Sequence, residues 1–120
     1  GHKKGDEALI AVAKALKGSC RENDFLARFG GEEFIIVMKD TNKAESIKMA
    51  ENIQASVASL SIPHKNSDVS SFITLSMGIT TYSVNKEDSA NNEKAIIKAD
   101  KALYYSKNNG RNQNTHFYDI

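Results

Sequence analysis

The sequence predicts an α+β fold, in which helices pack against a largely antiparallel sheet. Apolar residues recur at helical spacing in three segments and at strand spacing in four shorter ones, and a Gly-Gly pair joins two of the strands. The 120 residues, of which 40% are hydrophobic, suffice for one domain or a piece of one, with a single core. The expected order is helix, hairpin, helix, strand, helix, strand.

The N-terminal part of the chain predicts a helix followed by a β-hairpin. Before Gly18, which offers a helix stop, apolar side chains recur at helical spacing at Leu9, Val12, Ala13 and Leu16. Strands are expected at residues 24–29 and 34–38, and the second is entirely apolar, which suits a strand covered on both faces. Gly30-Gly31 lies between them and predicts a tight hairpin turn, because such a turn needs positive φ angles that glycine adopts easily.

The middle of the chain predicts a second helix and a further strand. Asn42 and Glu45 have the spacing of a capping box, which begins a helix. That helix has one apolar side, made of Ile47, Ala50, Ile53, Val57 and Leu60. Residues 61–70 are polar, so a loop is expected there, and residues 73–79 alternate as a strand with one apolar face.

The C-terminal part predicts a polar loop at residues 85–92, a helix and a short strand at residues 115–118. The helix is closed by Asn109-Gly110 and is marked by Ala95, Ile96, Ala99, Ala102 and Leu103. Tyr104 and Tyr105 on this helix are expected to be packing aromatics.

Composition limits the classes of function. The formal net charge is +1 with both signs interspersed, so no large field points to a nucleic acid polymer or an acidic membrane surface. Cys20 is the single cysteine and has no partner for an internal disulfide, which fits a reducing, cytoplasmic location. The longest apolar run, residues 34–38, is too short to cross a bilayer, and no signal peptide is visible, so no membrane contact by this segment is expected.

The hairpin carries the main candidate site. Glu32 and Glu33 directly follow the Gly-Gly turn, where two adjacent carboxylates are costly unless a positive group compensates them. A divalent metal bound to a nucleoside triphosphate would do so. Taken alone, the same residues also fit a solvated turn with two surface acids.

Several further motifs in order give the chain a resemblance to the GGDEF domain of bacterial diguanylate cyclases, in its GGEEF variant. The motifs are Gly1-His2-Lys3-Lys4-Gly5-Asp6-Glu7-Ala8-Leu9, Arg28-Phe29-Gly30-Gly31-Glu32-Glu33-Phe34, Ser76-Met77-Gly78-Ile79, Ala99-Asp100-Lys101-Ala102-Leu103-Tyr104-Tyr105-Ser106-Lys107 and Gly110-Arg111-Asn112. The resemblance implies a ferredoxin-like palm with a mostly antiparallel central sheet. It also implies condensation of two GTP to cyclic di-GMP and two pyrophosphates across a homodimer, with Mg²⁺ or Mn²⁺ as cofactor.

The family pattern also assigns roles at the hairpin and at the start of the chain. Glu32 matches a metal ligand proposed as proton acceptor, and Glu33 is expected to serve the metals or the hydroxyl. Gly30 and Gly31 would let the backbone approach the phosphates. His2 and Asp6 match nucleotide contacts, with Asp6 accepting from the guanine edge, although a histidine near a chain start is often inert or part of a tag scar.

Lys107 and Arg111 match the family positions that reach the triphosphate. They lie four residues apart around a helix end, so both are expected to face one anion. On spacing alone, two cations that stabilise a helix C-terminus through its dipole fit equally well.

Arg21 and Asp24 form an RxxD motif at the offset of the family's inhibitory product site. There Arg21 would grip guanine and phosphate, and Asp24 would bind a guanine edge. The family often adds an arginine from the helix after the hairpin, but residues 51–54 read Glu-Asn-Ile-Gln, so weaker product inhibition is expected.

The family's opening strand, with its DxDxFKxxND motif, has no match in residues 1–120. The chain is therefore expected to be a partial GGDEF domain that begins after the first strand, inactive by itself but part of an active parent. The alternatives are a module that binds cyclic di-GMP or GTP without catalysis, and a scaffold used only for dimerisation.

Overall fold

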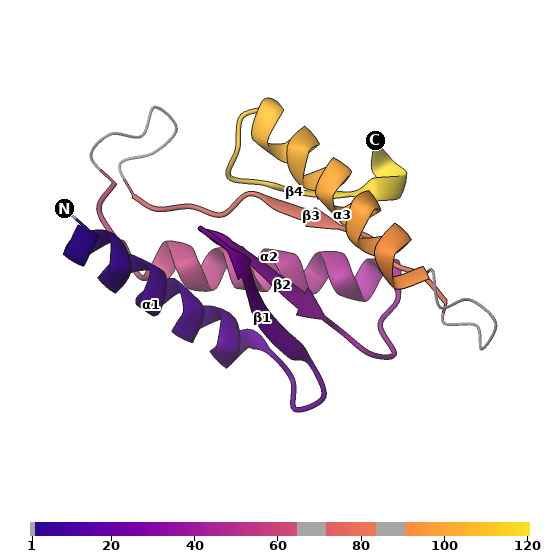
Figure 1. The fold of residues 1–120 in the computed structure, drawn as a ribbon, viewed down its shortest axis with the longest axis horizontal. Helices are drawn as coiled ribbons and strands as arrows, with labels where there is room; N and C mark the ends of the chain where they lie inside the picture. The colour runs from indigo at the N-terminus through magenta and orange to yellow at the C-terminus, as the bar shows by residue number, and fades with distance from the viewer. Residues whose placement is uncertain (1, 65–71, 84–90) are drawn as a thin grey trace.

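The computed structural model describes residues 2–64, 72–83 and 91–120, without the side chains of residues 2–4, 91 and 92. Its elements follow the predicted order (Figure 1): α1 (His2–Ser19), β1 (Phe25–Gly30), β2 (Glu33–Val37), α2 (Lys43–Ser59), β3 (Met77–Ile79), α3 (Asn91–Asn108), β4 (Asn114–His116) and the 3₁₀ helix η1 (Phe117–Asp119). The predicted α+β class is confirmed. None of the described helices is long and apolar enough to span a membrane.

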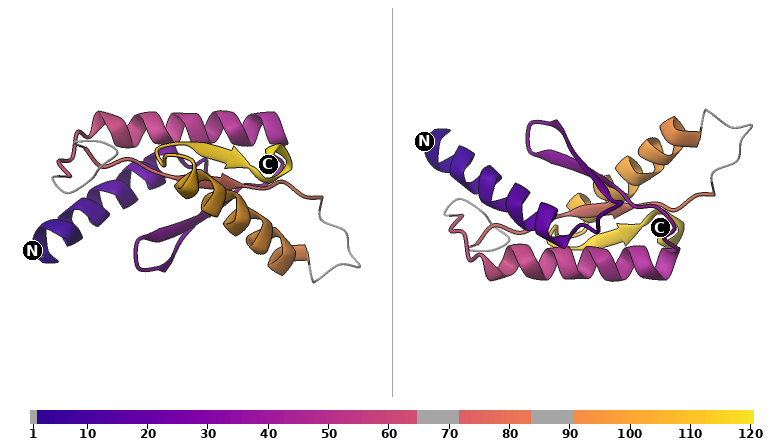
Figure 2. Two further views of the ribbon diagram at one scale, coloured as in Figure 1. Left: turned by 90° about the horizontal axis from the view of Figure 1, so that it is seen from above. Right: turned by 90° about the horizontal axis from the view of Figure 1, so that it is seen from below.

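Helices cover the strands from more than one side. α1 packs on α2, and α3 packs on both β3 and β4. Both views of Figure 2 show α2 along one side of the molecule and the β1–β2 hairpin projecting from the opposite side. The hairpin therefore lies on the face of the molecule opposite α2.

Within the described residues, the four strands form two separate pairs rather than one largely antiparallel sheet. β1 and β2 are antiparallel, with Phe25 opposite Val37 and a register shift between Arg28 and Gly30. β3 and β4 are parallel, with Gly78 opposite Thr115. The parallel pairing has a simple cause, because β3, α3 and β4 form a βαβ unit whose crossover helix returns the chain in the same direction.

Two strand predictions need correction. The prediction that residues 34–38 are covered on both faces is wrong, because β2 is half-buried and Val37 is 46% exposed. Among the described residues, β2 pairs only with β1. The predicted strand at 73–79 forms a ladder only over Met77–Ile79, and an isolated bridge joins Phe72 to Pro63. The predicted loops at 61–70 and 85–92 lie largely outside the described residues, and α3 already begins at Asn91.

The core lies between α1, α2 and the inner face of the hairpin. Its buried members are Val12, Leu16, Ile53 and Val57, and half-buried neighbours include Leu26, Phe34, Ile36, Leu75 and Met77. The predicted capping box of α2 is present, because Asn42 and Glu45 exchange side-chain and backbone hydrogen bonds. Leu60, expected on the apolar side of α2, is instead an exposed cap residue after its last turn.

The end of α3 is fixed to the parallel strands by close packing. An added Cβ at Gly78 would lie 2.2 Å from both the Ala99 carbonyl oxygen and the Leu103 nitrogen, so only glycine lets β3 approach the helix this closely. The fully buried Ser106 hydroxyl donates to the Met77 carbonyl (2.8 Å) and lies 2.7 Å from Thr115 Oγ1. Lys107, the next residue, is therefore held at a defined place.

Candidate active site

The Gly-Gly turn gives the hairpin tip its shape. Gly30 and Gly31 have φ angles of 147° and 53°, which other residues rarely adopt. Arg28 Nε donates to the Gly31 carbonyl oxygen over 2.9 Å and so closes the turn from the side. A Cβ added at either glycine would meet nothing within 4 Å, so the space around the tip is open. This openness is compatible with the predicted approach of phosphates.

The two candidate carboxylates have different surroundings. Glu32 is exposed in the turn, and no hydrogen bond or ion pair joins it to the described part of the chain. Glu33 begins β2, and its Oε1 lies 3.6 Å from Lys107 Nζ in the last turn of α3. The side chain of Glu33 is 45% exposed and that of Lys107 is 38% exposed. The fold thus brings together one predicted metal carboxylate and one predicted phosphate-binding cation.

The donor set fits a metal that arrives with a nucleotide. Within residues 2–64, 72–83 and 91–120, no three His, Cys, Asp or Glu side chains are grouped so that they could hold a metal ion. Mg²⁺ is commonly bound by one or two carboxylates together with substrate phosphates, and it keeps several waters. Glu32 and Glu33 supply such a pair of carboxylates at the tip.

The residues after α3 adopt a chain of left-handed conformations. Gly110 has φ 109°, and the Arg111 amide donates to the Ser106 carbonyl over 3.0 Å, which closes the helix in a Schellman motif. Arg111 and Asn112 also have positive φ angles, 60° and 44°, although neither is glycine. Such strained residues often cluster at functional sites. Arg111 is exposed just beyond the turn that carries Lys107, and the prediction that both face one anion stays a prediction.

The predicted nucleotide contacts on α1 are not joined to the hairpin. Asp6 is exposed on the first turns of α1, and no hydrogen bond or ion pair connects it to the described hairpin or to α3. The backbone of His2 begins α1, but its side chain lies outside the described part of the structure. The roles predicted for both residues stay predictions.

Arg21 and Asp24 pair with each other, which the sequence did not predict. The Arg21 amide donates to Asp24 Oδ2 (2.7 Å), and Arg21 Nη2 donates to Asp24 Oδ1 (2.9 Å). The Asp24 side chain is 0% exposed, and the bonds from Arg21 hold the pKa of this carboxyl below its usual value despite burial. Arg21 Nη2 also donates to Thr41 Oγ1 (2.6 Å), a residue that sequence reasoning missed because no motif marks it.

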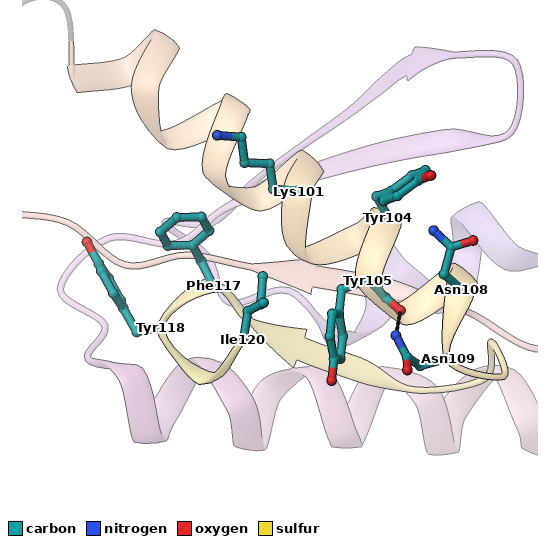
Figure 3. Close-up of a pocket in the computed structure, with 8 residues that line it drawn as sticks. All are labelled: Lys101, Tyr104, Tyr105, Asn108, Asn109, Phe117, Tyr118 and Ile120. Carbon is teal, nitrogen blue, oxygen red and sulfur yellow. Dashed lines mark hydrogen bonds between the residues drawn. The ribbon is translucent and has the colours of Figure 1, made fainter.

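A groove of about 670 Å³ lies between α3 and the C-terminal segment (Figure 3), and none of the predicted site residues lines it. It is lined mostly by aromatic and amide side chains, including Tyr104, Tyr105, Asn108, Phe117 and Tyr118. The prediction that Tyr104 and Tyr105 are packing aromatics is wrong, since they are 72% and 40% exposed. The helix turns Ala102 and Ser106 inward, whereas Tyr104 and Tyr105 between them face outward.

Comparison with known proteins agrees with this architecture. The family model described as "Diguanylate cyclase, GGDEF domain" matches residues 1–113. Diguanylate cyclase A of Treponema denticola is 40% identical over 116 residues, which cover 96% of this chain and 30% of the relative. Diguanylate cyclase DgcM of Escherichia coli is 37% identical over 113 residues, which cover 94% of this chain and 25% of the relative. The chain thus spans between a quarter and a third of these two relatives.

Solved structures give the same result. The GGDEF domain of DgcB from Caulobacter crescentus, in complex with c-di-GMP, has a TM-score of 0.82 at 30% identity and covers 98% of this chain and 67% of that one. The active GGEEF domain of a diguanylate cyclase from Vibrio cholerae has a TM-score of 0.77 at 31% identity, with 98% and 70% covered. The resemblance seen in the sequence is confirmed, and the chain belongs to the GGDEF family of diguanylate cyclase domains.

Proposed function

We propose that this domain acts in a diguanylate cyclase, which condenses two GTP into cyclic di-GMP and two pyrophosphates. The observation that carries the proposal is the hairpin tip, where Glu32 and Glu33 lie on an open Gly-Gly turn and Lys107 approaches from α3. Glu33, which we propose as a metal ligand, thereby lies beside Lys107, which we propose as a phosphate ligand. Membership of the diguanylate cyclase GGDEF family supports cyclic di-GMP synthesis as the proposed reaction.

In this proposal the residues divide proton transfer, phosphate binding, guanine recognition and metal binding among them. Glu32 accepts the proton of the attacking 3′-hydroxyl, and Lys107 and Arg111 bind the triphosphate. Asp6 accepts from the guanine edge, together with His2 at the start of α1. Glu32 and Glu33 would hold Mg²⁺ or Mn²⁺, which when bound neutralises charge that develops on the phosphates.

The reaction needs two such sites that face each other, one GTP on each protomer of a homodimer. Positioning and charge neutralisation supply most of the catalysis in phosphoryl transfer, so the domain's main task is to orient its GTP. Because residues 1–120 cover 67–70% of the two solved domains, we propose that they form part of a GGDEF domain whose DxDxFKxxND strand lies outside them. We expect a cytoplasmic location, because the substrate GTP is available there.

The test is a measurement of cyclic di-GMP formation by chromatography in the full-length protein with GTP and Mg²⁺. Glu32→Gln should lower kcat about 10²- to 10⁴-fold, the usual contribution of a positioned general base. Glu51→Gln, at an exposed acid on α2, serves as the matched control and should keep full activity. Activity that survives Glu32→Gln would reject the role assigned to the hairpin acids.

The proposal also places product binding at Arg21 and Asp24. The c-di-GMP complex of the related DgcB domain supports nucleotide binding within this family. A domain that binds cyclic di-GMP or GTP without turnover is the second candidate. In that case both ligands would bind, but neither the wild type nor any variant would form product from GTP.

A further inference from the structure

The Arg21 clamp is a closed set of hydrogen bonds made by Arg21, Asp24, the Lys39 carbonyl and Thr41. Arg21 Nη2 lies within hydrogen-bond distance of three acceptors, among which it shares its two N–H groups: Asp24 Oδ1 (2.9 Å), the Lys39 carbonyl oxygen (3.1 Å) and Thr41 Oγ1 (2.6 Å). Arg21 Nε donates to the same carboxylate over 3.1 Å. The clamp thus joins the segment before β1 to the segment after β2. It also engages Nε and Nη2 of the guanidinium, which would otherwise be available to a ligand.

The turn between β2 and α2 is shaped to accept Arg21. Asp40 has a left-handed backbone with φ 50°, which lets the chain reverse between Lys39 and Thr41. Thr41 Oγ1 donates its own proton to the Lys39 carbonyl oxygen over 2.8 Å. The Thr41 hydroxyl oxygen therefore has only its lone pairs left for further hydrogen bonds, and it accepts one from Arg21.

The charges around the clamp favour its closed form. The hydrogen bond that Arg21 donates to Asp24 raises the pKa of Arg21 most, and the charges of Glu45 and Asp40 raise it further. All three are anions, so they attract the guanidinium and would repel the two phosphates of a cyclic dinucleotide. The helix segment 51–54 brings no arginine to offset them.

We propose that Thr41 controls the affinity for cyclic di-GMP by holding Arg21 in the closed clamp, so that the ligand binds only after Arg21 has left Thr41 and the Lys39 carbonyl. The inference rests on the proposed product site at Arg21. When the binding-competent state is only a fraction of the population, the apparent affinity falls by that fraction. Any change that weakens the clamp without touching Arg21 or Asp24 should then strengthen binding.

The experiment is a calorimetric titration of the full-length protein with cyclic di-GMP. Thr41→Val keeps the shape of the side chain but removes the hydroxyl, and it should lower Kd about three- to tenfold, the range expected for the loss of one hydrogen bond of ordinary net strength. Thr41→Ser restores the hydroxyl and should bind like the wild type. Thr74→Val, the same change in the extended segment before β3, is the matched control and should leave Kd unchanged.

A second readout reports the clamp without ligand. The Arg21 Nε–H resonance in a ¹H–¹⁵N spectrum should move toward the position of a free arginine in Thr41→Val but not in Thr41→Ser or Thr74→Val. The same spectra verify that each variant is folded.

The outcomes separate this inference from the product site itself. If the wild type binds and Arg21→Ala abolishes binding, but Thr41→Val binds equally or more weakly, the product site stands and the control by Thr41 is overturned. If Arg21→Ala binds as tightly as the wild type, or if neither the wild type nor Thr41→Val binds at millimolar ligand, the product site and the clamp proposal are both overturned.

Discussion

The glycines of the hairpin tip and the glycine of β3 are required for opposite reasons. Gly30 and Gly31 have positive φ angles, but a Cβ added at either would meet no atom within 4 Å. At Gly78 the neighbours leave no room, because the backbone of α3 lies 2.2 Å from the position of an added Cβ. One region needs glycine for backbone conformation, and the other needs it for space.

This contrast separates the candidate site from its support. The tip carries exposed carboxylates and one half-exposed ion pair, so substitutions there should change binding more than stability. The contact between β3 and α3 is a packed backbone interface, so substitutions there should change stability first. The predictions below test this division, from the largest expected effect to the smallest.

Gly78→Ala should have the largest effect. The new methyl group would overlap the Ala99 carbonyl and the Leu103 backbone, neither of which can rotate away, so α3 must move off β3. We expect the free energy of unfolding in urea to fall by about 3 kcal/mol, at the upper end of overpacking costs. Gly18→Ala in α1, where a Cβ meets nothing within 4 Å, is the control and should be neutral or slightly stabilising. Equal stability of the two variants would contradict the contact.

The next effect concerns pH and the buried His116 of β4. Its Nδ1 accepts from the Tyr118 amide (3.2 Å), so Nε2 carries the proton toward Thr81 Oγ1 (3.1 Å). Burial, and then the charge of Lys43, lower the pKa of His116, although Asp119 opposes them. The unfolded chain then binds more protons than the native one below about pH 6.5, the ordinary histidine value. Stability should therefore be fully retained above that pH and should fall as the pH drops through it.

Urea unfolding at pH 7.5 and pH 5 measures this loss. His116→Gln should remove most of the difference between the two pH values, whereas the exposed His64→Gln should keep it. An unchanged pH dependence in His116→Gln would show that other groups cause it.

Local features of the fold were predictable from the sequence because they depend on neighbouring residues. The capping box of Asn42 and Glu45 and the Gly-Gly hairpin turn need only short-range geometry, and both are present. The parallel pairing of β3 with β4 was not predicted, because it depends on where the crossover helix returns the chain. The length of β3 was overestimated, since alternation describes an extended chain whether or not a partner strand lies beside it.

The candidate site shows the same limit. Motifs identified Glu33 and Lys107 separately, but their 3.6 Å contact joins residues 74 positions apart and follows only from the fold. The RxxD motif marked Arg21 and Asp24 without showing that they bond to each other. Sequence patterns therefore indicated which residue types matter, whereas their partners required the structure.

Gly31→Ala should have a smaller effect than Gly78→Ala. The methyl group would meet no atom within 4 Å, so only the left-handed backbone at φ 53° opposes it. This conformation costs a residue with a Cβ roughly 1–2 kcal/mol, and we expect the loss in urea unfolding to be near 1 kcal/mol. Gly31→Asn, which tolerates that conformation better, should lose less. A loss as large as that of Gly78→Ala would mean that the tip is packed rather than open.

Lys107→Gln should have the smallest effect on stability and a clear effect on binding. Exposed ion pairs contribute about 0–1 kcal/mol, and this one spans 3.6 Å between half-exposed side chains, so the free energy of unfolding should change by less than about 0.5 kcal/mol. GTP affinity, measured by calorimetry with Mg²⁺, should nevertheless fall about tenfold if Lys107 binds phosphate, equivalent to about 1.4 kcal/mol. Lys101→Gln, an exposed lysine on the same helix, is the control and should leave GTP affinity unchanged. A loss of stability above 1 kcal/mol in Lys107→Gln would instead make this ion pair the tie that holds the hairpin to α3, and the division between an open site and its packed support would fail.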